Sequence, residues 1–177
     1  MNKQSTGNRW LKYALIGLLF GIADWYYLDL LAHFNWGNFG SSILVIPIFL
    51  LLNYGFWLVP ILPIVVVESR RGSRILSPVL AGVITWSSAI ASYYAFYTVL
   101  LSLGVLPHLA GLNVFGDRYP GFWEDWMAVF RKIILAQFFE WIVIAIVGGG
   151  LIGAVVSFVY RTWINRKSST SPGTELS

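Results

Sequence analysis

The sequence predicts an all-α fold, a polytopic membrane protein with four transmembrane helices in a bundle and one interfacial amphipathic helix before the fourth. Two observations predict it. Of the 177 residues, 57% are hydrophobic and only 11% are charged, whereas soluble domains carry about 25% charged residues. The apolar residues also gather in runs that can cross a hydrocarbon core of ~30 Å at ~1.5 Å per residue. We expect one domain, residues 1–167, and a flexible polar tail, residues 168–177.

The first predicted helix, residues 13–32, contains two carboxylates, Asp24 and Asp29, and is followed by His33. An Asp near the centre of a spanning helix costs ~2.5–3.5 kcal/mol, and each Leu, Ile or Phe returns ~0.3–0.6 kcal/mol. The nine such apolar residues that offset this cost are Leu15, Ile16, Leu18, Leu19, Phe20, Ile22, Leu28, Leu30 and Leu31. We therefore expect insertion, with the acids facing other helices and not lipid.

The second predicted helix, residues 43–67, contains several helix breakers. Pro60 and Pro63 each lack a backbone donor, so we expect one kinked helix with its sharpest bend between them. Such a bend is tolerated in a membrane where neighbouring groups satisfy the freed carbonyls.

The third predicted helix, residues 77–103, begins with a serine–proline pair, which is typical of an N-cap and a first helical position. After a long connection, residues 122–131 place aromatic residues and a methionine on one helical face, with two acids in the first turn. This pattern predicts the interfacial helix. Residues 133–160 form the fourth predicted span, which is long enough to require tilt.

The basic residues predict the orientation of the helices. Only Arg118, Arg131 and Lys132 fall on one side of the predicted spans. The nine on the other side are Lys3, Arg9, Lys12, Arg70, Arg71, Arg74, Arg161, Arg166 and Lys167. Because basic residues accumulate on the cytoplasmic side, we expect a multi-pass protein of the cell (inner) membrane with both termini in the cytoplasm.

With this topology, the polar residues of the spans gather in the half of the bilayer away from the cytoplasm. A buried polar group in a membrane helix is costly and suggests a functional site. The candidate binding residues are Asp24, Asp29, His33, Asn53, Tyr93, Tyr94, Tyr97, Gln137 and Glu140. Their convergence predicts a polar and aromatic cavity in the outer half of the membrane.

Two pairs within this set allow more than one interpretation. Asp29 and His33 share a helical face and suit either half of a metal site or a hydrogen-bonded pair at the helix end. We favour the hydrogen-bonded pair, because two ligands on one helix are too few for a metal site. Gln137 and Glu140 suit a proton or cation site and a polar clamp between helices about equally well. We predict no metal site and no cofactor.

Two pairs of glycines predict close helix packing. Gly17 with Gly21, and Gly149 with Gly153, have the four-residue spacing that lets membrane helices approach closely. We favour packing of the first helix against the fourth within one chain over a dimer interface, because such pairs are common in membrane bundles. On a helical wheel Asp24 lies ~20° from Gly17, so this packing would turn the acid away from lipid.

Several function classes are disfavoured by what the sequence lacks. The absence of cysteine excludes disulfides, thiol nucleophiles and thiolate metal sites. No Walker loop, dinucleotide fingerprint, HExxH or GxSxG motif occurs. The net charge of +4 resides at the ends of the predicted spans, so we expect contact with the lipid bilayer and not with nucleic acid.

The function that these observations favour is not enzymatic. We expect a small transport-type or accessory protein that binds a cation, a proton or a small lipophilic ligand in the outer cavity. One alternative is a structural or assembly subunit, with homo-oligomers or other membrane-complex proteins as its partners. Another is an intramembrane enzyme that acts on a lipid or isoprenoid and uses Asp24, Asp29 or Glu140 as acid or base.

Overall fold

The structure is a computed structural model that describes residues 3–33, 45–71, 74–103 and 120–169. All secondary structure in these ranges is helical. The elements are α1 (Lys3–His33), α2 (Val45–Gly55), α3 (Leu58–Arg70), α4 (Leu76–Ser102), α5 (Phe122–Val129), the π-helix η3 (Phe130–Leu135) and α6 (Ala136–Ser169).

Three helical segments of the described chain are long and apolar enough to cross a membrane. They are Asn8–Leu31, Leu76–Ser102 and Phe122–Trp163, and the last, which runs through α5, η3 and α6, has the highest mean hydropathy, 2.6. Many large apolar side chains of the first and third segments are exposed on the surface of the chain, as expected where lipid replaces water as the solvent, whereas most of those of Leu76–Ser102 are buried or half-buried. The described part of the chain is therefore all-helical and fits a membrane protein.

The second predicted helix is not continuous, which corrects the expectation for residues 43–67. α2 ends at Gly55, a turn occupies Phe56 and Trp57, and α3 begins at Leu58. The break comes before the bend expected between the prolines. Pro60 lies in the first turn of α3, where a missing N–H costs no intrahelical hydrogen bond.

The predicted interfacial helix is not a separate element either. α5 continues directly into η3 and α6, so the chain is helical without interruption from Phe122 to Ser169. α5 begins after Gly121, whose φ of 94° is a left-handed conformation that glycine adopts without strain. The π-helical turn, in which the hydrogen bonds run from i to i+5, joins the two segments without a break in the helix.

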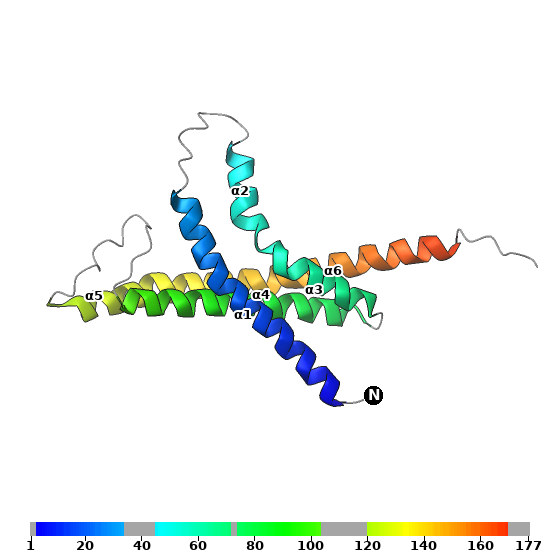
Figure 1. The fold of residues 1–177 in the computed structure, drawn as a ribbon, viewed down its shortest axis with the longest axis horizontal. Coiled ribbons are helices and arrows are strands. Elements are labelled where there is room, and N and C mark those ends of the chain that lie inside the picture. Colours follow the sequence, from blue (N-terminus) through cyan, green and yellow to red (C-terminus); the bar gives the residue numbers. More distant parts are fainter. Residues whose placement is uncertain (1–2, 34–44, 72–73, 104–119, 170–177) are drawn as a thin grey trace, which may run out of the picture.

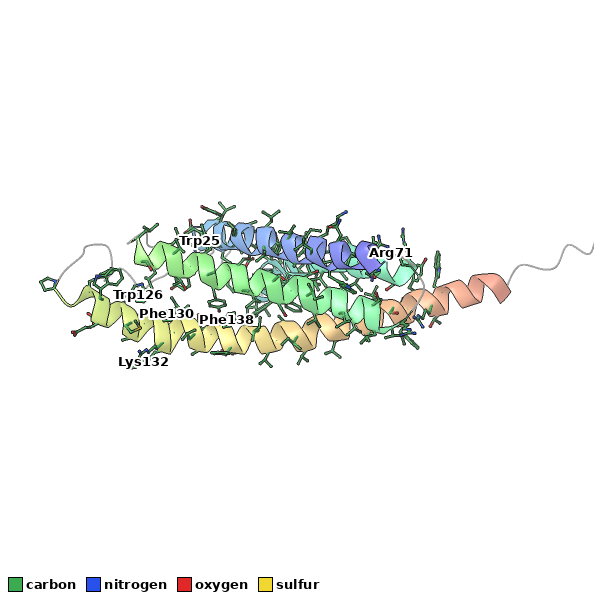
Figure 2. All side chains as sticks on the ribbon, turned by 90° about the horizontal axis from the view of Figure 1, so that it is seen from below. Trp25, Arg71, Trp126, Phe130, Lys132 and Phe138 are labelled. Carbon is green, nitrogen blue, oxygen red and sulfur yellow. The ribbon has the colours of Figure 1, made fainter. Side chains whose placement is uncertain are left out.

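α4 is the central helix of the fold. It contacts α1 on one side and α6 on another, and α3 packs against both α4 and α6. Figure 1 shows α4 and α6 side by side and antiparallel along the long axis, with α1 crossing α4 obliquely and α2 leading away from them. Seen from below, α4 lies between α1 and α6 (Figure 2).

The small residues of α1 face α4, and not α6 as expected. A Cβ added to Gly17 would meet the carbonyl oxygen of Thr85, and one added to Gly21 would meet the carbonyl oxygen of Ala89 and the hydroxyl of Ser92. These contacts leave no room for a methyl group, so the two backbones touch along this face.

The small residues of α6 also face α4. A Cβ on Gly149 would lie 2.8 Å from the carbonyl oxygen of Gly82, and one on Gly153 would lie 2.6 Å from the carbonyl oxygen of Pro78. Both glycine pairs therefore line interfaces with α4, which corrects the expected direct packing of the first predicted helix on the fourth.

Candidate functional site

A cavity of about 330 Å³ lies where α1, α2, α4 and α6 approach one another. α1, α2, α4 and α6 each contribute a polar group to its wall. The lining residues are Asp24, Leu28, Phe49, Tyr54, Trp57, Ile90, Tyr93, Tyr94, Gln137 and Trp141. The cavity lies towards the end of α1 and α4 and the start of α6, so the polar contributions of these three helices come from the same half of the fold.

Asp24 is the most unusual residue of this wall. Its side chain is completely buried, with 0% relative exposure. Neither carboxylate oxygen has a hydrogen-bond partner among the described residues. An isolated buried carboxylate is strongly disfavoured in a medium of low dielectric constant, so this group requires a proton or an opposite charge at the cavity.

The position of Asp24 follows from the close approach of α1 to α4. Asp24 lies three residues after Gly21, and this spacing places both residues on the same helical face. Because Gly21 brings the α1 backbone against Ala89, that face is covered by α4 and the acid is removed from lipid. The glycine contact thus determines the burial of the carboxylate.

Four further polar side chains line the cavity: Tyr54 from α2, Tyr93 and Tyr94 from α4, and Gln137 from α6. Several serine and threonine hydroxyls of α4 have a different role. Ser88 and Thr98 donate to carbonyl oxygens four residues earlier, both at 2.7 Å, and so satisfy their own helix. The phenols and the amide are therefore the polar groups that α4 and α6 offer to a ligand.

The rest of the wall is aromatic and is held by ring contacts across helices. Tyr54 of α2 stacks on Trp141 of α6 with their ring centroids 6.2 Å apart. Trp57, in the turn before α3, stacks on Trp86 of α4 at the same distance. These pairs join the broken segment α2–α3 to the central helices and give the cavity flat, polarisable walls.

Other predicted site residues lie elsewhere. Tyr97 is buried in the aromatic cluster beside the cavity, Asp29 is half-buried on α1, and Glu140 is exposed on α6; none of the three lines the cavity. The side chains of His33 and Asn53 lie outside the described residues. Within the described chain, no three His, Cys, Asp or Glu side chains form a group that could hold a metal ion.

A second buried carboxylate, which the sequence reasoning missed, lies at the opposite end of the fold. The side chain of Glu68, near the end of α3, is 1% exposed. Its Oε1 accepts hydrogen bonds from the hydroxyl of Tyr13 and from Arg71, the latter at 2.7 Å. Its Oε2 accepts one from the hydroxyl of Ser77 at 2.6 Å.

Arg9 completes this network with an ion pair to Oε2 of Glu68 at 3.4 Å. Glu68 thereby joins α1, α3 and the first turn of α4, near Arg71 in Figure 2. Burial alone would raise the pKa of Glu68, but the hydrogen bonds and positive charges outweigh it and hold the pKa below its ordinary value of 4.5. Glu68 is thus an ionised structural group, in contrast to the unpaired Asp24.

A sequence signal for this network exists but is weak. Glu68 is the single acid in the run ESRRGSR, which follows the second predicted helix and contains three arginines. An acid among arginines is usually solvated, and its partner Tyr13 is 55 residues away. The tertiary structure was needed to bring the two together.

The chain was compared with protein families, with curated proteins and with solved structures. It matches no family model, no curated protein and no solved structure. Function is therefore argued from its own residues.

Proposed function

We propose that this chain is an integral membrane protein of transport or accessory type that binds a small ligand at Asp24 in the cavity between α1, α2, α4 and α6. The ligand is a cation, a proton or a small lipophilic molecule. One observation carries the proposal: a fully buried carboxylate, without a partner in the described chain, on the wall of a cavity large enough for a ligand.

The proposal includes four spans, of which α2 and α3 together form the second. Each of the two is too short to cross the hydrocarbon core alone, with 11 and 13 residues. The stacked pair Tyr27–Phe56 and the hydrogen bond from Tyr27 to the carbonyl oxygen of Leu52 tie this broken span to α1. Such a break suits a site inside the membrane, because irregular backbone at that depth is tolerated where it lines a cavity.

The proposed orientation places both termini in the cytoplasm and the cavity in the outer half of the inner membrane. The contact of Arg9 with Glu68 supports it, because it brings the basic start of α1 and the basic end of α3 to the same end of the fold.

Reporter fusions test this orientation. A reporter fused after Arg74 or after Lys167 is expected to be active in the cytoplasm, and one fused after Asn113 is expected to be active outside it. Two reporters are used at each site: a phosphatase that is active only outside the cytoplasm and a fluorescent protein that is active only inside it. The two give opposite readouts for each fusion site. An external signal after Arg74 would contradict both the orientation and the outer position of the cavity.

Cysteine accessibility tests the cavity itself, and the chain provides a background free of cysteine. Leu28 lines the cavity, whereas Leu30, two residues later on the same helix, is 69% exposed on the surface that lipid would cover. A charged methanethiosulfonate reagent added outside reacts with thiolates, which require a polar environment. Leu28→Cys is therefore expected to be modified, and Leu30→Cys to be protected.

The reverse order of reactivity, or protection at both positions, would contradict a cavity that a ligand can enter from outside. Modification by the same reagent in unfolded protein controls for the presence of both thiols. Ligands that occupy the cavity are expected to slow the modification of Leu28→Cys.

A second candidate function, assembly with another membrane protein, is favoured by Glu140. This acid is exposed on α6 among apolar neighbours that are also exposed, such as Phe139 and Val143. A carboxyl group on a lipid-facing surface is costly, and a partner helix with a basic or hydrogen-bonding group at that depth would relieve the cost. Purification of the protein alone as a stable, monodisperse species would argue against this candidate.

The enzymatic alternative has less support. Acid–base chemistry on a lipid generally needs two groups in defined protonation states. Asp24 is the one carboxyl group among the described residues that line the cavity, because Asp29 and Glu140 lie outside it.

A further inference from the structure

We propose that the ligand of this cavity is a small organic monocation, whose ammonium-type group pairs with Asp24 while its apolar or aromatic body packs against the aromatic wall. This inference rests on the proposed function, and it specifies the chemical class of the ligand. Three properties of the cavity support it: its charge, the small number of its oxygen ligands and its aromatic walls.

The carboxylate of an ionised Asp24 requires one positive charge in the cavity. Asp24 offers two buried oxygens that no described side chain or backbone group satisfies. The basic residue nearest in sequence within α1 is Lys12, twelve residues before Asp24, and its side chain is exposed. That separation along a helix is ~18 Å, too far for an ion pair. An ionised Asp24 therefore needs a countercharge from the ligand, whereas a protonated Asp24 needs none, and a comparison of a charged with an uncharged probe distinguishes the two.

A divalent metal cation does not fit the donor set. Ca²⁺ takes about six to eight oxygen ligands, and Mg²⁺ requires an octahedron of them. The described wall offers one carboxylate, three phenols and one amide, and no group of three His, Cys, Asp or Glu side chains that could hold a metal ion forms in the described chain. An organic ammonium ion needs only one carboxylate, because its substituents already occupy the remaining directions around the charge.

The aromatic walls suit such an ion. Indole and phenol rings attract a cation placed over their faces within about 6 Å of the ring centroid, and this attraction is stronger without water. Trp57 and Trp141 lie on the same wall as Asp24, and each is held by a stacked neighbour. The faces are thus pre-organised, which reduces the entropy lost when a ligand binds.

The size of the cavity limits the ligand. A volume of about 330 Å³ is near the lower end of the range for small-molecule pockets, ~300–1,000 Å³. One aromatic ring with a trimethylammonium group fits such a volume. Benzyltrimethylammonium is therefore a suitable probe, and neopentylbenzene, in which carbon replaces the nitrogen, is its uncharged counterpart of the same shape.

Equilibrium binding of these two probes to the purified protein in detergent tests the inference, with protein-free micelles as the control for partitioning. The wild-type protein is expected to bind benzyltrimethylammonium about tenfold or more tightly than neopentylbenzene, because only the cation satisfies the carboxylate. The fluorescence of Trp57 and Trp141 is expected to change on binding, since both rings line the cavity.

Two matched variants locate the effect. Asp24→Asn keeps the size of the side chain and removes its charge, and it is expected to abolish the preference for the cation while neopentylbenzene binds as before. Glu124→Gln makes the same change at an exposed carboxyl group of α5, outside the cavity, and it is expected to leave both affinities unchanged. Thermal unfolding of both variants in detergent verifies that they are folded.

Equal binding of the two probes to the wild-type protein would overturn the inference and leave a cavity for neutral lipophilic ligands, as the proposed function allows. This comparison needs no variant, so it stands even where Asp24→Asn fails to fold. Loss of the preference in Glu124→Gln but not in Asp24→Asn would also overturn it. Binding of neither probe would overturn it too, and the modification of Leu28→Cys then decides whether the proposed function fails with it.

Discussion

Replacing Gly21 by alanine is expected to lower the free energy of unfolding by about 2–3 kcal/mol, because the added methyl group meets backbone and not a movable side chain. The nearest atoms are the carbonyl oxygen of Ala89 and the hydroxyl of Ser92 on α4. α1 would have to move away from α4, and this movement would also expose the buried side chain of Asp24. Reversible unfolding in mixed detergent micelles measures the change.

Gly150→Ala is the matched control. A Cβ at Gly150 would lie 3.9 Å from Val79 and Val83, which is an ordinary van der Waals contact. Alanine there is expected to be neutral or to stabilise the helix by about 0.5–1 kcal/mol, because glycine is a poor helix former. Equal effects at Gly21 and Gly150 would contradict the tight α1–α4 interface.

Replacing Glu68 by glutamine is expected to lower the free energy of unfolding by about 2 kcal/mol, because the hydrogen bonds to a charged acceptor are weakened and two arginines lose their counterion. The loss is moderate, because Arg71 is half exposed and can be hydrated. Unfolding in mixed micelles measures it, with the exposed acid Glu124 changed to glutamine as the control, for which we expect no effect.

The contribution of Glu68 is expected to depend on pH in a defined direction. The pKa of Glu68 in the folded protein lies below its ordinary value of 4.5. Its stabilising effect is therefore fully present above pH 4.5 and is lost as the pH falls through the lower, folded value. The stability difference between the wild type and Glu68→Gln should accordingly shrink on acidification, and a difference that grew would contradict an ionised Glu68.

The sequence by itself was sufficient to predict that this chain consists of helices suited to a membrane. Long apolar runs with few charges can satisfy their backbone groups in lipid only as helices, so composition and run length were sufficient. It also singled out Asp24, because an acid inside such a run has a high cost that requires a reason. The sequence also predicted that Tyr93, Tyr94 and Gln137 lie near Asp24, and the structure places all four in the lining of one cavity.

The pattern of the sequence did not determine where helices break or join. Pro60 and Pro63 were expected to bend one helix, but the chain breaks earlier, at Phe56 and Trp57. Pro60 then lies in the first turn of α3, where its missing N–H costs no hydrogen bond, and Pro63 lies inside α3. Residues 122–131 were expected to be separate from the fourth span, but a π-helical turn joins them. In both places the outcome depends on whether neighbouring groups can replace the backbone hydrogen bonds that an irregular turn loses.

Only the tertiary structure decided which helices meet. A glycine pair indicates a helix face that another backbone can approach closely, but it does not predict which helix that is. The glycine pairs that include Gly21 and Gly149 therefore did not predict that both faces pack against α4. For the same reason the aromatic wall around Asp24 and the network around Glu68 were not visible in the sequence. Their members are far apart in the chain, and they come together because α4 lies between α1 and α6.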